Sequence, residues 1–127
     1  MKDIKIPSSV NIGGQVIPVV IVNDEDKNSP LNNSGSDYCG FCGLWDMRAG
    51  TIYLNATLSP SMMYNTLVHE VLHAALDTLG YYKVSTNEIM VNSLAAVLTE
   101  ALTTAKYDEC EEKIENESEI KSEIINE

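Results

Sequence analysis

The chain has 127 residues, of which 44% are hydrophobic and 21% charged, and its formal net charge is −11 at pH 7. This length and composition are typical of one soluble globular domain with a single core. The only arginine is Arg48 and the lysines form no cluster, which excludes the usual basic footprint of nucleic-acid or anionic-lipid binding. The longest apolar stretch, residues 16–22, is too short to span a bilayer.

The first 55 residues are predicted to form β-strands. In "SSVNIGGQVIPVVIV", two β-branched runs flank Gly13-Gly14, which predicts a β-hairpin. Pro18 has no backbone N–H, so we expect the second run to be an edge or bulged strand. Further along, "CGLWDMRAGTIYLN" predicts a short strand, a turn and a strand over residues 51–55. We therefore expect a small, mostly antiparallel sheet.

The second half of the chain is predicted to be helical. Ser59 followed by Pro60 indicates an N-cap with proline at the first helical position, and Gly80 is placed to end that helix. A second helix is expected to begin at "STNE", where Ser85 and Glu88 have the spacing of a capping box, and to run to about residue 105. The predicted fold class is α+β, with the sheet packed on two helices.

The first helix carries an apolar face at the helical period, made by Val68, Val71, Leu72, Ala75 and Leu79. Its two histidines are expected at the rim of this face, where a cleft between helix and sheet would open. Glu70 is expected on the side away from it.

Residues 1–107 are predicted to form the folded domain, and residues 108–127 an acidic tail. The tail contains nine acidic residues and two lysines, a net charge of −7. It has few apolar residues, so it is predicted to be a frayed helix or disordered.

The segment "HEVLH" contains the only two histidines, His69 and His73, with Glu70 directly after the first. Residues four apart on a helix project side by side, so both imidazoles can reach one ion. The H-E-x-x-H pattern is typical of zinc sites in which the glutamate acts as general base on zinc-activated water. We therefore predict a zinc site with Glu70 as the catalytic residue. Two partly buried structural histidines are the alternative.

A catalytic zinc site needs a third protein ligand, and no third histidine exists. Asp77 is too far along the same helix and is predicted to accept a hydrogen bond from an imidazole, with a plain exposed aspartate equally compatible. Glu88 lies on the face of the second helix that can look across at the first. Its alternative role is in the capping box, and Glu100 is the next candidate ligand.

The segment "EIMVNSLA", residues 88–95, resembles the second-helix signature of the ImmA/IrrE-type zinc metallopeptidase-like proteins. The residues that match are Glu88, Val91, Asn92, Leu94 and Ala95. With "HEVLH" and the strand "GTIYLN" included, the resemblance covers about residues 40–100. The chain in this region resembles a minimal gluzincin. The resemblance implies a zincin-like fold, His69, His73 and Glu88 as zinc ligands, and a peptide or protein substrate. Small members are encoded by bacteriophages and prophages.

The predicted function is zinc-dependent peptide hydrolysis in the cytoplasm, which is the host cytoplasm for a phage-encoded protein. No nucleic acid or membrane is expected as a partner. The alternative is a non-catalytic module that keeps zinc to join its two helices while its surface binds a partner. The N-terminus has no apolar run typical of a signal peptide, so Cys39, Cys42 and Cys110 are expected as reduced thiols.

Overall fold

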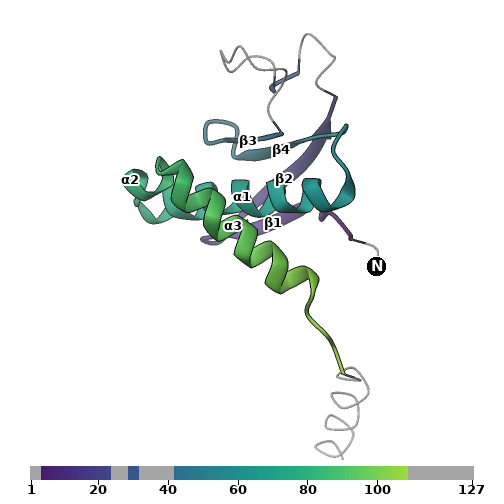
Figure 1. The fold of residues 1–127 in the computed structure, drawn as a ribbon. Coiled ribbons are helices and arrows are strands. Elements are labelled where there is room, and N and C mark those ends of the chain that lie inside the picture. The colour runs from purple at the N-terminus through teal and green to yellow at the C-terminus, as the bar shows by residue number, and fades with distance from the viewer. Residues whose placement is uncertain (1–3, 24–28, 32–41, 109–127) are drawn as a thin grey trace, which may run out of the picture.

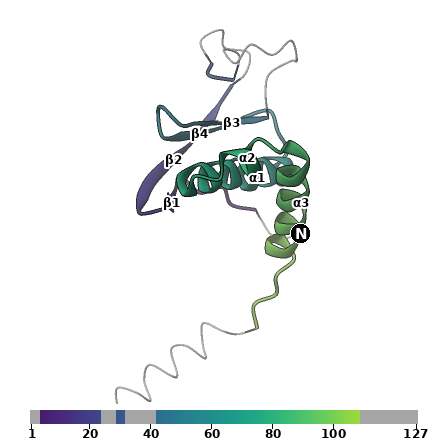
Figure 2. The ribbon, with the colours of Figure 1, turned by 90° about the vertical axis from the view of Figure 1, so that its left-hand side faces the viewer.

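The computed structural model describes residues 4–23, 29–31 and 42–108. The fold class is α+β, as predicted: a four-stranded mixed sheet lies on one side and the helices on the other (Figures 1 and 2). In chain order the elements are β1 (Ser9–Ile12), β2 (Gln15–Val22), β3 (Gly43–Asp46), β4 (Thr51–Asn55), α1 (Pro60–Leu79), α2 (Tyr82–Ser85) and α3 (Glu88–Thr103).

The strand order is β1-β2-β4-β3, and two of the three pairings are antiparallel. The predicted hairpin joins β1 to β2, with Ile12 opposite Gln15. Gly13 and Gly14 have φ angles of 59° and 81°, which two-residue hairpin turns require and which glycine adopts at low cost. Strand β4 pairs in parallel with β2 on one side and antiparallel with β3 on the other, so β3 lies at the edge of the sheet.

Pro18 does not mark an edge strand, because β2 lies between β1 and β4. The pairing with β1 ends at Pro18, opposite Ser9, and the pairing with β4 begins at Val19. The proline therefore lies where β2 changes partner, so its missing N–H interrupts neither pairing.

Helix α1 begins and ends as predicted. The Ser59 hydroxyl accepts from the Met62 N–H at 3.3 Å, and Gly80 ends the helix in the left-handed conformation with φ 84°. Its most buried face differs from the prediction, because the helix packs on the sheet and on α3 at once. The buried residues of α1 are Met63, Thr66, Leu67, Glu70 and Ala74, so Glu70 lies on the buried face and not away from it.

The apolar core lies between α1 and the sheet. Its buried members are Ile17, Val19, Ile52, Leu54, Met63, Leu67 and Ala74. Fully burying a valine, leucine, isoleucine or methionine side chain contributes about 1.5–3 kcal/mol to the stability of the fold. The core therefore fixes α1, and the histidines it carries, against β2 and β4.

The predicted capping box at the start of the second helix is wrong. Ser85 ends the separate short helix α2, and α3 begins at Glu88. The side chain of Asn87 caps α3 by accepting from the Met90 N–H at 3.2 Å. Glu88 is therefore the first residue of α3 and does not occupy the third position of a cap.

Helix α3 crosses α1 on the side away from the sheet and ends at Thr103. Its inner face buries Val91 and Ala95. Apart from Asp108, the predicted acidic tail lies outside the described residues. Among the helices of the described residues, none has the length and apolar character to cross a bilayer.

Candidate metal centre

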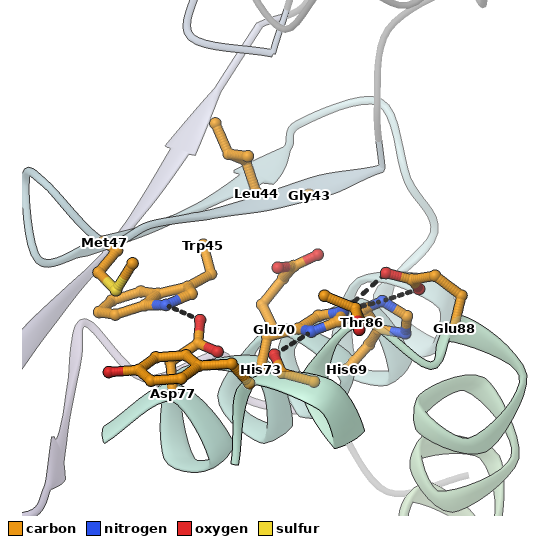
Figure 3. A pocket seen from close by; sticks show the side chains of 12 residues that line it. Gly43, Leu44, Trp45, Met47, His69, Glu70, His73, Asp77, Thr86 and Glu88 are labelled. Carbon is orange, nitrogen blue, oxygen red and sulfur yellow. Dashed lines mark hydrogen bonds and ion pairs between the residues drawn. The ribbon is translucent and has the colours of Figure 1, made fainter. Parts of the chain in front are cut away.

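His69, His73 and Glu88 meet at the junction of α1 and α3 (Figure 3). The two Nε2 atoms are 3.1 Å apart. Glu88 Oε1 is 3.1 Å from His73 Nε2, and Glu88 Oε2 is 3.3 Å from His69 Nε2. Ligand atoms 2.0–2.1 Å from a tetrahedral ion lie about 3.3–3.4 Å apart. The spacing of these three side chains is therefore compatible with one bound metal ion.

Two elements bring the three side chains together. The spacing of four residues on α1 places both histidines side by side, and the first residue of α3 places Glu88 opposite them. Glu100 lies three turns further along α3, about 18 Å away. Within the described residues, the cluster that could hold a metal consists of His69, His73 and Glu88, so Glu100 does not supply the third donor.

The partners of the imidazoles come from α2 and α3. The Ser85 hydroxyl is 3.0 Å from His73 Nδ1, and the Asn92 side chain forms a hydrogen bond with His69. Such contacts orient an imidazole toward a metal. No sequence signal pairs Ser85 with a histidine 12 residues earlier, whereas Asn92 belongs to the segment that carries the family resemblance.

Asp77 does not bind an imidazole. Its Oδ2 accepts a hydrogen bond from Trp45 Nε1 at 3.2 Å. Asp77 lies one turn beyond His73 on α1, about 6 Å along the axis, and Trp45 reaches it from β3. Ser85 takes the position beside His73 that was predicted for Asp77.

The environment of His69 favours its neutral form. Burial and the neighbouring His73 lower its pKa, against a smaller raising effect of Glu88 and Asn92. A neutral imidazole is the form that binds metal ions. The histidine side chains are 18% and 14% exposed, whereas that of Glu88 is 60% exposed. The cluster therefore opens toward solvent on the Glu88 side.

Glu70 lies beside the cluster, buried between α1 and β3. Burial raises the pKa of its carboxyl to about 7; the Glu88 charge adds to this, and the Trp45 backbone N–H opposes it. A carboxyl with a pKa near neutrality can accept and release a proton under ordinary conditions. Glu70 thus lies next to the cluster of His69, His73 and Glu88 and is not part of it, and its role as a general base stays a prediction.

Gly43 makes room for Glu70 at the start of β3. A Cβ atom at this position would lie 2.6 Å from Thr66 Cγ2 and 3.3 Å from Glu70 Cγ. The Thr66 hydroxyl is bonded to the Met62 carbonyl at 2.8 Å, and a β-branched side chain changes rotamer with difficulty. Strand β3 therefore approaches α1 closely because residue 43 has no side chain.

We expect Gly43→Ala to lower the free energy of unfolding of the metal-free protein by about 1–3 kcal/mol, because it overpacks this contact. Urea unfolding monitored by circular dichroism measures the change. The double variant Gly43→Ala with Thr66→Ser removes the clashing methyl group, keeps the hydroxyl, and should recover part of the loss. An unchanged midpoint in the single variant would contradict the close approach.

Two cavities open from the cluster in opposite directions. One of about 680 Å³ extends toward Trp45, Met47 and Asp77, and one of about 340 Å³ extends toward Cys42, Asn65 and Asn92. Gly43, His69, Glu70 and Glu88 line both. The cluster thus lies between two hollows along β3.

The outer edge of β3 faces these hollows. The Asn55 N–H donates to the Cys42 carbonyl at 2.9 Å, and the strands are antiparallel. In such a ladder paired and unpaired residues alternate, so the N–H and C=O groups of Gly43 and Trp45 point away from β4. The Trp45 N–H is the group that contacts Glu70. Within the described residues, the outer edge of β3 has no strand beside it.

Cys42 is an exposed free thiol. Cys39 and Cys110 lie outside the described residues, and the reduced state of the three cysteines stays a prediction.

No protein-family model, no curated protein and no solved structure matches this chain.

Proposed function

We propose that this protein hydrolyses peptide bonds with a zinc ion held by His69, His73 and Glu88. The observation that carries the proposal is the convergence of two imidazoles and one carboxylate at the spacing of tetrahedral ligands, with a buried glutamate beside them. Two nitrogen donors and one oxygen donor suit zinc, and three protein ligands leave a position for water or substrate. Bound zinc would polarise a carbonyl group and acidify water.

Glu70 supplies the acid–base chemistry in this proposal. Its carboxylate takes a proton from the attacking water and delivers it to the amine that leaves when the peptide bond breaks. The Trp45 backbone N–H holds the carboxylate beside the three proposed metal ligands. Burial between α1 and β3 limits competing water at the proton acceptor.

The edge of β3 provides a binding surface for an extended peptide. The outward Gly43 and Trp45 carbonyls and the Gly43 N–H can pair with a peptide backbone in the manner of an added strand. Hollows on both sides of the cluster leave room for residues before and after the cleaved bond. These features support an internal peptide bond of a peptide or protein as the substrate.

The resemblance of "HEVLH" and "EIMVNSLA" to the ImmA/IrrE-type metallopeptidases supports the same function. In that family pattern the two histidines and the glutamate are the zinc ligands. A cytoplasmic protein of phage or prophage origin would fit this resemblance.

The test is zinc content together with peptide cleavage. We expect the purified protein to contain about one zinc per chain by elemental analysis. We also expect it to cleave members of a random peptide library, lose that activity to a chelator and regain it with added zinc. Cleavage that persists after complete removal of metal would contradict the proposal.

The second candidate function is a non-catalytic zinc-stabilised binding module. Exposed apolar side chains on α3 favour it, notably Ile89 at 82% and Val97 at 65% exposure, because such patches mark interaction surfaces. Stoichiometric zinc without cleavage of any library peptide would support this module over the peptidase.

A further inference from the structure

The larger cavity continues beyond His73 to a group of side chains that the proposed hydrolysis does not use. Trp45 and Met47 come from the β3 region, and Asp77 comes from the next turn of α1. The Met47 side chain lies beside the Trp45 indole, and Asp77 lies below it (Figure 3). We call Trp45, Met47 and Asp77 the acidic corner. Tyr82 lines the same cavity.

The hydrogen bonding of Asp77 leaves acceptor capacity in this corner. Trp45 Nε1–H donates a hydrogen bond to Asp77 Oδ2 at 3.2 Å. Within the described part of the chain, Asp77 Oδ1 has no hydrogen-bond partner. A carboxylate has about four lone-pair sites, and one indole N–H satisfies one of them. The indole donor also holds the carboxylate in place, so little rotamer freedom would be lost on binding a ligand.

The acidic side chains that line the cavity are not balanced by basic ones. Among the described residues that line it are the carboxylates of Glu70, Asp77 and Glu88, and no lysine or arginine. Glu70 and Glu88 belong to the metal centre, and a dication there would offset their charge. Asp77 lies beyond the cluster, so its charge would remain for a ligand.

We infer that the acidic corner binds the positively charged side chain of a lysine or arginine in the peptide substrate. This rests on the proposed function, because the corner and the metal centre share one cavity. The aliphatic stem of such a side chain would lie on the Trp45 ring and Met47, and its charged head would reach Asp77. The carboxylate gives a charge-assisted hydrogen bond, and the aromatic face adds a cation–π contact.

The test uses binding without turnover. The zinc-loaded Glu70→Gln variant is titrated with two short peptides that are identical except that lysine in one is norleucine in the other. Trp45 is the only tryptophan, so its fluorescence reports binding from within the corner. We expect the lysine peptide to bind about tenfold more tightly, as a hydrogen bond to a charged group typically contributes that much.

Adding Asp77→Asn to this variant should remove the preference, because the amide oxygen can still accept from Trp45 while the charge is lost. Adding Glu100→Gln makes the same acid-to-amide change at an exposed position of α3 and should keep the preference. Equal affinities for both peptides, no binding of the lysine peptide, or a preference that survives Asp77→Asn would each overturn the inference.

Failure of this inference differs from failure of the proposed function. If the wild type cleaves peptides without regard to lysine or arginine, the function stands and the corner does not select substrates. If no peptide is cleaved while the lysine preference depends on Asp77, the corner stands as a binding site and the peptidase does not.

Discussion

Replacing Glu70 by glutamine is expected to reduce the rate of peptide hydrolysis by about 10²- to 10⁴-fold, the usual contribution of a general base. The amide has nearly the same shape but accepts no proton from water. It can still accept the hydrogen bond from the Trp45 backbone N–H, so the contact with β3 is kept. Because burial already disfavours the charged form of this carboxyl, a neutral side chain should not destabilise the fold.

The measurement is kcat/KM for a cleaved library peptide, with zinc content and thermal midpoint determined on the same preparation. Glu100→Gln is the matched control and should hydrolyse the peptide like the wild type, since its side chain is exposed on α3 away from the cluster. Loss of zinc in Glu70→Gln would show that Glu70 is a ligand, and full activity would remove it as the base.

Glu88→Gln is expected to weaken zinc binding by more than about a hundredfold. Loss of a hydrogen-bond partner behind a metal ligand already costs about 10–100-fold, and Glu88 would be a ligand itself. Its carboxylate supplies negative charge next to a dication, which a neutral amide cannot replace. The metal-free protein should change little, because the side chain is 60% exposed and the cap of α3 is Asn87. Losing an acidic residue from the first turn costs only about 0.3–1 kcal/mol.

Zinc affinity by competition with a chromophoric chelator, and unfolding of the metal-free protein, should be compared for wild type, Glu88→Gln and Glu100→Gln. A buffer at pH 8 keeps His69 neutral, because burial lowers its pKa, so the comparison contains no ion pair between Glu88 and a charged His69. Equal zinc affinities in wild type and Glu88→Gln would remove Glu88 from the ligand set.

Local patterns predicted those parts of the structure that depend on neighbouring residues. The hairpin at Gly13-Gly14 and the bounds of α1 follow from backbone preferences and capping within a few residues. The convergence of His69 and His73 follows from the geometry of one helix turn. The histidine pair that could hold a metal ion and the position of Glu70 next to it could therefore be predicted before any packing was known.

Packing between elements decided the features that were predicted wrongly. The buried face of α1 was predicted from one apolar stripe, but a helix between a sheet and a second helix has two packed faces. The spacing of Ser85 and Glu88 satisfies a capping box, yet Asn87 caps α3 and Ser85 turns toward His73. Alternative N-cap residues at the start of a helix differ in stability by only about 1 kcal/mol, so contacts with other elements determine which of them caps the helix.

The amino-acid sequence by itself determined the histidine pair that could hold a metal ion, the position of Glu70 next to it and the α+β class, because each depends on chain-local geometry or on composition. Only the tertiary structure decided that Glu88, and not Glu100, lies opposite the histidines, and that Asp77 faces Trp45. Those contacts join residues 15 to 32 positions apart, whose distance depends on how α3 crosses α1 and how β3 approaches it. That approach is set by core burial and by the room that Gly43 leaves, neither of which is expressed in the spacing of residues along the chain.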